Sequence, residues 1–245
     1  MKLRLVLVAI AALSFNAIAE LPAPDSDGWI TFFNGKDLTG WDGLDGYWSV
    51  VDGAIQCQET KTNSKQSDLI LLASKENPEK FANFEMHYSW KIVSPDANSG
   101  VQIRSVIDHP EMKHVGGYQA DIDAKHSYTG IIYCEGGVAG GRGIMSNRGE
   151  KTLWDENNQR INTKLEKSSD EIKKAIRPQG EWNDCVIIAD GNRIIYKING
   201  IVTTDMTDNS PKARKDGVIA LQMHGGFDMT IQFKGFKIKM LPVTK

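Results

Sequence analysis

Hydrophobic and polar residues alternate along four stretches of this chain, and each stretch predicts a β-strand with one buried and one polar face. In the first stretch, residues 84–91, the apolar positions are Phe84, Met86, Tyr88 and Trp90, and the polar positions are Glu85, His87, Ser89 and Lys91. The other three stretches are residues 101–104, 118–123 and 219–224. Four such strands predict a sheet that packs on one side and presents functional groups on the other.

The polar positions of the last three stretches carry groups suited to binding and reaction. They are Gln102, Arg104, Gln119, Asp121, Asp123, Gln222 and His224. Arg, His, Asp and Gln are poor strand formers, and Gly100 and Gly117 beside them allow a close approach of backbone and ligand. The pattern favours a groove that binds a polar ligand. A sandwich whose solvent face is merely polar is the alternative.

Short strands separated by turns account for most of the remaining chain. They are predicted at residues 48–51, 54–58, 68–73, 129–134, 182–189, 193–198 and 201–205. One segment looks helical, because Ser168 or Ser169 can cap it, Asp170 and Glu171 suit its positive end, and Pro178 follows it. The sequence therefore predicts an all-β, two-sheet antiparallel sandwich with one short inserted helix.

Length and composition fit one soluble globular domain preceded by an export signal. The chain has 245 residues, of which 40% are hydrophobic and 24% charged. Lys2 and Arg4 precede an apolar run too short for a membrane anchor, and small residues precede Glu20. We expect a signal peptide over residues 1–19, a single domain over 20–245, and a bacterial protein that is periplasmic or secreted without a membrane anchor.

Charge and cysteine content exclude some function classes. Without Lys2 and Arg4 the chain has 27 basic and 31 acidic residues, which argues against a nucleic-acid partner. Cys57, Cys134 and Cys185 are widely spaced, so at most one disulfide can form and no short metal-ligand spacing is present. We expect Cys134 to be a buried structural thiol.

Five motifs in order along the chain resemble those of the 3-keto-disaccharide hydrolase family. They are residues 33–41 (FNGKDLTGW), 98–100 (NSG) with Arg104, 180–183 (GEWN), 198–200 (ING) and 221–225 (LQMHG). The resemblance covers about residues 27 to 241 and implies a concanavalin A-like jelly roll. It also implies cleavage of the glycosidic bond in sugars already oxidised at C3 by a separate sugar 3-dehydrogenase, the expected pathway partner.

The implied chemistry is removal of the C2 proton, which a C3 ketone acidifies, followed by loss of the glycosidic oxygen from C1. Such a route needs a base, donors for the developing enolate and an acid for the departing oxygen. The candidate catalytic residues are Asp121, His224, Glu135 and Arg104, with Asp121 or His224 as base and Arg104 as the enolate or hydroxyl clamp. The candidate substrate-binding residues are Glu85, His87, Asn98, Gln102, Gln119, Asp123, Tyr133, Arg142 and Gln222.

Several alternatives stay open at this point. Asp121 and Glu135 could hydrolyse the bond directly as a carboxylate pair, and the same fold also serves non-catalytic, lectin-like carbohydrate-binding modules. No cofactor is required, although His87, His224, Asp121 and Glu135 suit a divalent metal. His224 could be a packed histidine and Arg104 an ion-pair partner of Asp121. Tyr128 and Trp154, expected in loops, could stack on a sugar ring or simply pack.

Overall fold

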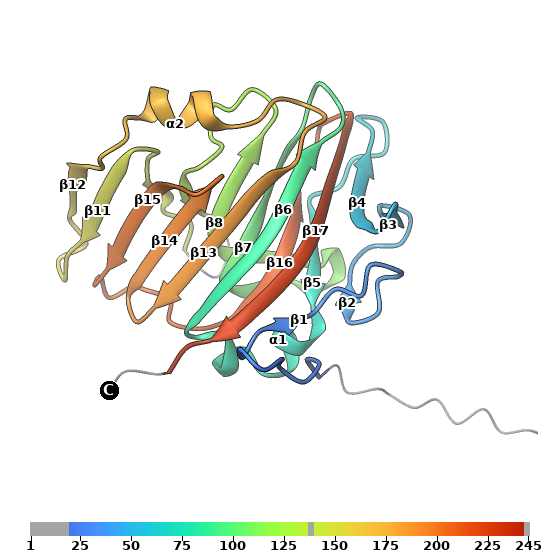
Figure 1. Ribbon diagram of the computed structural model, residues 1–245, viewed down its shortest axis with the longest axis horizontal. Coiled ribbons are helices and arrows are strands. Elements are labelled where there is room, and N and C mark those ends of the chain that lie inside the picture. The colour runs from blue at the N-terminus through green and yellow to red at the C-terminus, as the bar shows by residue number, and fades with distance from the viewer. Residues whose placement is uncertain (1–19, 137–139, 243–245) are drawn as a thin grey trace, which may run out of the picture.

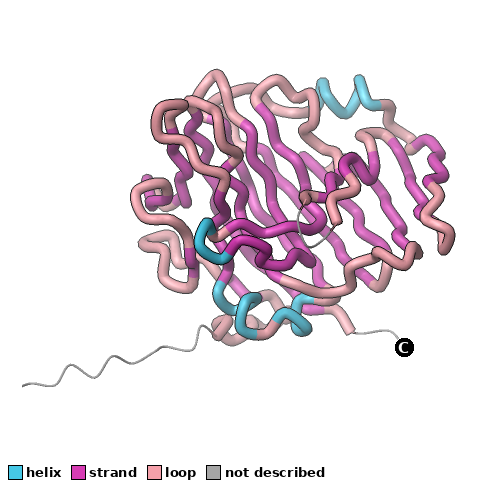
Figure 2. The backbone as a smooth tube through the Cα atoms, turned by 180° about the vertical axis from the view of Figure 1, so that it is seen from behind, coloured by secondary structure: helices cyan, strands magenta, loops and turns pink. Residues whose placement is uncertain are grey.

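Two β-sheets packed face to face make up the protein in a computed structural model that describes residues 20–136 and 140–242. The signal peptide expected over residues 1–19 lies outside the described residues. In Figure 1 the larger sheet lies in front and strands of the smaller sheet pass behind it, while Figure 2 shows the smaller sheet from its own side. The two-sheet jelly-roll sandwich predicted from the sequence is confirmed.

The larger sheet has ten strands. Its order is β12 (Arg160–Lys164), β11 (Glu150–Trp154), β15 (Ile201–Asp208), β14 (Arg193–Ile198), β13 (Asn183–Asp190), β6 (Phe84–Ile92), β17 (Met229–Met240), β4 (Ala54–Glu59) and β3 (Trp48–Val51), and β1 (Ile30–Thr31) also pairs with β17. Its pairs are antiparallel apart from β11 and β15, which run parallel.

The smaller sheet has seven strands, all paired antiparallel. Its order is β10 (Gly143–Ser146), β9 (Ile132–Cys134), β8 (His114–Asp123), β7 (Asn98–His109), β16 (Val218–Met223), β5 (Ser67–Leu71) and β2 (Trp41–Asp42). Within the described residues, the helical segments are α1 (Leu72–Glu76), η1 (Pro78–Phe81), η2 (Pro110–Met112) and α2 (Ser169–Ala175).

The core lies between the sheets and follows the alternation in the sequence. Strand β6 buries every second residue, and its buried side chains Phe84, Met86 and Trp90 pack with Val101 and Tyr118 from the smaller sheet. Burial of large apolar side chains contributes roughly 1.5–3 kcal/mol each relative to exposure. The outer face of β7, β8 and β16 is left to carry the polar residues.

Helix α2 forms where the sequence predicts it. The Ser168 hydroxyl accepts from the backbone N–H of Glu171, and the Glu171 carboxylate accepts from the backbone N–H of Ser168, a reciprocal capping box. Ile172 anchors the helix as its buried residue.

Three local expectations are wrong. The strand expected over residues 68–73 ends at Leu71, because α1 begins at Leu72. Trp154 ends strand β11 rather than lying in a loop, and its indole N–H donates to the Met145 carbonyl at 3.0 Å. The predicted single functional sheet is split, since β6 belongs to the larger sheet and β7, β8 and β16 to the smaller one.

Candidate active site

A pocket of about 300 Å³ opens on the outer face of the seven-stranded sheet. Its lining residues come from β7, β8, β9, β10, the loops between them and the end of β16. They are Asn98, Gln119, Asp121, Tyr128, Tyr133, Glu135, Ile144 and His224. The structure thus brings together Asp121, Glu135 and His224, three of the four residues that the sequence analysis named as catalytic.

A chain of glutamines forms the floor of this pocket. Gln102 donates to Oε1 of Gln119 at 2.7 Å, and Gln119 Nε2 donates both to Asp121 Oδ1 and to Gln222 Oε1, the latter at 3.1 Å. Gln222 Nε2 then donates to Oε2 of Glu135 at 3.1 Å. Because the donors and acceptors alternate consistently, the amide orientations are fixed, and the chain links the two carboxyl groups.

Gly100 makes room for this network. A Cβ at this position would lie 2.5 Å from Cγ and 2.6 Å from Cδ of Gln119, which pairs with Gln102 across β7 and β8. The side chain of Gln119 therefore lies directly over the backbone of Gly100. The glycine in the Asn98-Ser99-Gly100 motif therefore leaves space for the amide side chain of Gln119 and is not explained by direct contact with a ligand.

Asp121 is the most perturbed acid of the pocket. Burial raises its pKa to about 8, and the charges of Glu135 and Asp123 add to this, while the hydrogen bond from Gln119 acts in the opposite direction. The carboxyl group is therefore largely protonated at neutral pH. A protonated acid in an open pocket can donate a proton to a bound ligand.

Glu135 accepts two hydrogen bonds with its carboxylate oxygens. Oε2 accepts from Gln222, and Oε1 accepts from the backbone N–H of Gly136 at 3.4 Å. These two hydrogen bonds hold its carboxyl group in place. Beside it, burial and the charges of Glu135 and Asp121 raise the pKa of Tyr133, which keeps the phenol protonated as a donor.

His224 lies at the edge of the pocket with one ring nitrogen occupied. Nδ1 lies 2.9 Å from the carbonyl oxygen of Gly225, which can only accept, so Nδ1 carries the proton in the neutral ring. Nε2 is then left with a lone pair. The ring also packs edge-on against Phe227, with a centroid distance of 5.4 Å. This arrangement suits a proton acceptor held in one tautomer.

Arg104 does not share the polar face, so that prediction is wrong. The β7–β8 register breaks between Ile103 and Val106, and Arg104 adopts a φ of 48°. This bulge turns the guanidinium away, where it donates to the carbonyl oxygen of Ala82 from Nε at 3.0 Å and from Nη2 at 2.6 Å. Arg104 is almost completely buried and holds loops together.

Arg142 also lies outside the pocket. Its guanidinium forms a buried ion pair with Asp208, donates to the hydroxyl of Ser210 at 2.9 Å, and lies over the ring of Trp154. Glu85 and His87 lie on the larger sheet, with Glu85 Oε1 2.6 Å from His87 Nε2. None of these three predicted binding residues reaches the ligand-accessible space of the pocket.

Asp123 supports the pocket from beneath. Its carboxylate accepts from the backbone N–H groups of Ser127, Tyr128 and Thr129 at 2.9, 2.8 and 2.7 Å. These bonds shape the loop that carries Tyr128, whose half-exposed ring lines the pocket. Gln102 and Gln222 likewise act through hydrogen bonds to lining residues, whereas Asn98, Gln119 and Tyr133 line it directly.

Sequence reasoning missed Ile144 and Asp68. Ile144 lines the pocket from β10, where it pairs with Tyr133, but nothing in its apolar type signals a binding role. Asp68 is fully buried beside the network, and burial and the charges of Glu135 and Asp108 raise its pKa well above the usual range. Asp68 precedes the apolar residues Leu69 and Leu71 of the same strand, so nothing in the sequence indicates that it differs from an ordinary polar strand residue.

The predicted metal ligands are not assembled. Among the residues that the structure describes, no group of three or more His, Cys, Asp and Glu side chains is placed to hold a metal ion. His87 lies on the larger sheet and cannot join Asp121, Glu135 and His224. No helix within residues 20–136 and 140–242 is long and apolar enough to cross a membrane.

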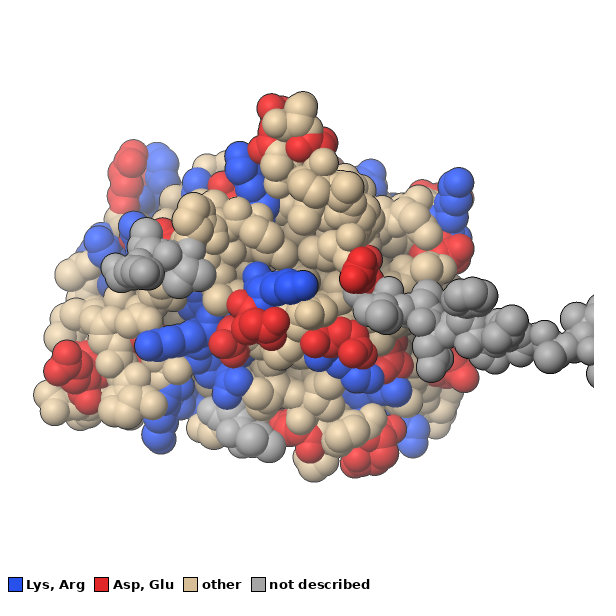
Figure 3. Space-filling model, turned by 90° about the horizontal axis from the view of Figure 1, so that it is seen from below, with Lys and Arg blue, Asp and Glu red and all other residues tan. Residues whose placement is uncertain are grey.

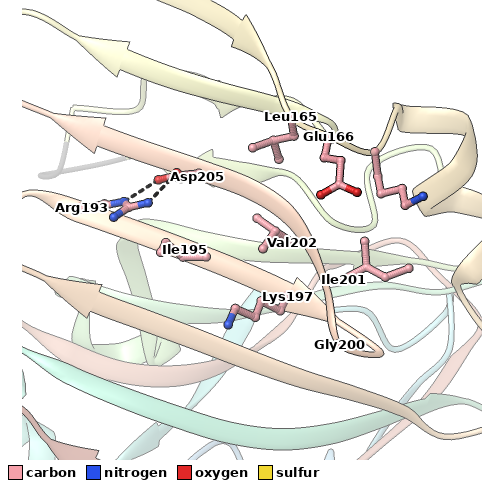
Figure 4. Close-up of a pocket in the computed structure, with 10 residues that line it drawn as sticks. Leu165, Glu166, Arg193, Ile195, Lys197, Gly200, Ile201, Val202 and Asp205 are labelled. Atoms are coloured by element: carbon pink, nitrogen blue, oxygen red, sulfur yellow. Dashed lines mark hydrogen bonds and ion pairs between the residues drawn. The ribbon is translucent and has the colours of Figure 1, made fainter.

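A larger depression of about 520 Å³ lies on the outer face of the ten-stranded sheet, over β14 and β15. Figure 4 shows Arg193 paired with Asp205 at one side of this depression, which Ile195, Val202 and Ile201 also line. Both oxygens of Asp205 are occupied by this guanidinium, at 2.7 Å each. On another face, Figure 3 shows acidic and basic side chains interspersed. The smaller pocket is the better candidate for catalysis because it combines acids, a histidine and phenols.

The fold and the pocket together define a jelly-roll protein with an acid- and histidine-lined pocket on the outer face of its smaller sheet. The chain belongs to the 3-keto-alpha-glucoside-1,2-lyase-like domain family, whose sequence profile matches residues 28–239. This confirms the family that the sequence motifs resemble.

Individual relatives are similar over different parts of the chain. A 3-keto-disaccharide hydrolase of Bacteroides thetaiotaomicron is 36% identical over 91 residues, which cover 34% of this chain and 29% of that relative. The solved structure of a candidate glycosyl hydrolase from Parabacteroides distasonis has a TM-score of 0.55 at 22% identity, over 88% of this chain and 95% of that one. A second such structure from the same organism has a TM-score of 0.54 at 20% identity, over 87% and 99%. These two structures support the fold.

Proposed function

We propose that the protein cleaves the glycosidic bond of 3-keto-glycosides or 3-keto-disaccharides by proton abstraction at C2 and elimination. The observation that carries the proposal is that Asp121, Glu135 and His224 line one open pocket, in which burial raises the pKa of Asp121 to about 8. The 3-keto substrate is taken from the family and from the name of the Bacteroides relative.

In the first step, Nε2 of His224 removes the C2 proton and the C3 ketone becomes an enolate. Its hydrogen-bonded Nδ1 keeps the ring in the tautomer that this step needs. The phenol of Tyr133 and the amide of Asn98 line the same pocket and are the donors we assign to the enolate oxygen. They take the role that the sequence analysis gave to Arg104.

In the second step, the enolate reforms the ketone, a C1–C2 double bond forms, and the C1–oxygen bond breaks. The protonated carboxyl group of Asp121 donates its proton to the departing oxygen. Water that adds across the double bond afterwards gives the net hydrolysis product. Glu135 accepts a hydrogen bond from Gln222, which in turn accepts from the Gln119 that donates to Asp121.

Tyr128 supports a sugar ring as the substrate. Its side chain is 51% exposed at the pocket and presents a flat aromatic surface, on which sugars commonly stack. The pocket of about 300 Å³ has room for one sugar ring.

The test uses a 3-keto-glucoside and its parent glucoside. We expect cleavage of the first and none of the second, because the C2 proton of the parent is far too weakly acidic for a side-chain base. Deuterium at C2 should slow the reaction or exchange with solvent. Full retention of deuterium without a rate effect would favour direct hydrolysis by Asp121 and Glu135, and binding without cleavage would favour a lectin-like module.

The proposal also includes export of the protein from the cytoplasm and prior oxidation of the sugar substrate at C3. The basic and apolar start of the chain supports a signal peptide, and N-terminal sequencing of the native protein should find Glu20 or a neighbouring residue first. Since the substrate carries a C3 ketone, an oxidoreductase acting on sugars must supply it. No cofactor is needed for the steps above.

A further inference from the structure

Two histidines and a methionine meet at the far end of the β7–β8 hairpin, outside the pocket described above. His109 ends β7, His114 begins β8, and the short helix η2 that joins them carries Met112. Together with Gln66 these three side chains line a depression of about 380 Å³. The sequence analysis did not single out this His-x-x-Met-x-His spacing.

The hairpin fixes the two imidazoles side by side. His109 and His114 are direct partners in the strand register, and their ring centroids lie 5.9 Å apart at an interplanar angle of 54°. An ion bound to a ring nitrogen at about 2.0 Å lies roughly 3 Å from the ring centroid. Two imidazoles on one ion therefore have centroids about 5 to 6 Å apart for bond angles between tetrahedral and linear. The observed separation falls in that range.

The buried carboxylate of Asp108 orients the imidazole of His114 in the way that is usual for metal-binding histidines. Asp108 Oδ1 lies 2.5 Å from His114 Nδ1, and the Asp108 side chain is only 1% exposed. The carboxylate accepts from Nδ1–H and leaves the Nε2 lone pair toward the depression, where the Gln66 amide lies 3.4 Å away. In metalloproteins, a histidine that binds a metal with one ring nitrogen commonly donates the N–H of the other ring nitrogen to a carboxylate.

The surrounding charges suit a cation. Lys113, which stands between the ligands in sequence, is turned away, and its ammonium lies 2.9 Å from Asp42 Oδ1. Glu111 lies beside the ring of His109, with Oε1 3.6 Å from Nδ1. Within the described residues, Met112 and Met240 are the methionines that are not buried, so this thioether is open to a ligand.

We propose that His109, Met112 and His114 form a binding site for a soft monovalent cation, Cu(I). Thioether and imidazole together select Cu(I), whereas two imidazoles without the sulfur also suit Zn(II). Cys57, Cys134 and Cys185 are buried, so no thiol of the folded chain competes for the ion. The site lies about 17 Å along β8 from Gln119, five residues away at roughly 3.4 Å each.

The experiment titrates the folded protein anaerobically with Cu(I) against a chromogenic chelator, and in parallel with Zn(II). We expect one Cu(I) per chain. Met112→Leu should weaken Cu(I) binding at least tenfold and change Zn(II) binding less than twofold. His109→Gln should weaken both ions, and since the His109 side chain is 62% exposed, this variant should fold normally.

His87→Gln and Met240→Leu are matched controls, because they remove a histidine and a methionine elsewhere and should leave Cu(I) binding unchanged. The proposal is overturned if the wild type binds no stoichiometric Cu(I). It is overturned equally if Met112→Leu and His109→Gln bind Cu(I) as tightly as the wild type. It is also overturned if Met112→Leu weakens Zn(II) as much as Cu(I), since the thioether would then not select Cu(I).

Discussion

Gln222 donates a hydrogen bond from its Nε2 to Oε2 of Glu135 at 3.1 Å, and this bond ties strand β16 to the segment that follows β9. The two residues are 87 positions apart in sequence. Because Gln222 also accepts from Gln119, the position of Glu135 depends on an amide chain that crosses three strands. The acids of the pocket are therefore held as one unit.

Gln119 is the central residue of this hydrogen-bonded series of glutamine side chains. Gln119→Leu should therefore lower both the stability and the activity of the protein. The leucine removes the hydrogen bonds that Asp121 Oδ1, Gln222 Oε1 and Gln102 Nε2 make with Gln119 in a buried place, which costs about 1–3 kcal/mol for each group left unsatisfied. We expect a loss of about 2–4 kcal/mol in chemical denaturation and at least a tenfold loss of kcat. Gln232→Leu, which breaks a glutamine pair with Gln56 in the other sheet, should lower stability and leave the kcat of the folded protein unchanged.

Asp121→Asn should change how stability depends on pH. The pKa of Asp121 is raised from 3.8 to about 8 in the folded state, so the wild type is stabilised fully below about pH 4 and loses this stabilisation as pH rises toward 8. Asn keeps the bond from Gln119 and cannot ionise. We expect the variant to equal the wild type near pH 4 and to exceed it by a few kcal/mol near pH 8, at about 1.4 kcal/mol per pKa unit.

Denaturation curves between pH 4 and 9 check this prediction. The neighbouring Asp123→Asn is the matched control, since the Asp123 carboxylate accepts three backbone hydrogen bonds and its loss should destabilise the protein instead of stabilising it. Parallel curves for the wild type and Asp121→Asn would show that Asp121 is ionised in the folded protein at neutral pH.

Activity should fall at alkaline pH for the same reason. If protonated Asp121 delivers the proton to the leaving oxygen, kcat/KM falls above about pH 8 as this carboxyl ionises. Asp121→Asn should lose at least a hundredfold in kcat with the disaccharide. A 3-keto-glucoside with a good leaving group, such as nitrophenol, should recover much of that rate, because such a group departs without a proton. Equal losses for both substrates would contradict the assignment.

His224→Gln should remove the base without unfolding the protein. His224 is partly exposed and its ring makes one hydrogen bond, to Gly225, so the melting temperature should move by only a few degrees. General-base catalysis is worth about 10²–10⁴ in rate, and kcat should fall by that factor. Exchange of the C2 deuterium should stop in parallel. His87→Gln on the larger sheet is the control, and exchange that persists in His224→Gln would exclude His224 as the base.

Arg104→Met should mainly reduce stability. It leaves the Ala82 carbonyl without its donors and replaces a buried guanidinium, and we expect a loss of about 2–4 kcal/mol. The folded fraction at low temperature should keep a kcat within a few fold of the wild type. Arg160→Met, which removes a surface pair with Glu150, should cost less than about 1 kcal/mol. A large loss of kcat in the folded Arg104→Met variant would contradict this and show that Arg104 contributes to catalysis.

The alternation of polar and apolar residues was sufficient to predict the strands and the faces of β6, β8 and β16. It was not sufficient to assign them to sheets, because a period of two is the same in either sheet. Glu85 and His87 therefore looked like partners of Gln119 and Asp121, although they lie on the other side of the sandwich. Sheet membership depends on pairings distant in sequence.

Arg104 shows a second limit. The alternation Val101, Gln102, Ile103, Arg104 continues without a break in the sequence, and only the bulge after Ile103 turns Arg104 toward Ala82. No glycine stands within the bulged segment itself, although Arg104 has a positive φ; the glycine opposite the bulge, Gly117, lies on the partner strand. Asp121, Glu135 and His224 were found because their types suit acid and base chemistry, and the fold brings them together.

All three cysteines are buried as free thiols in separate parts of the sandwich. The domain therefore takes its stability from noncovalent contacts, and no disulfide cross-links it. Folding of this chain should proceed equally in a reducing and in an oxidising medium, with no need for disulfide exchange. The chain would therefore reach the same structure in a reducing compartment where it is made and in an oxidising compartment to which it is exported.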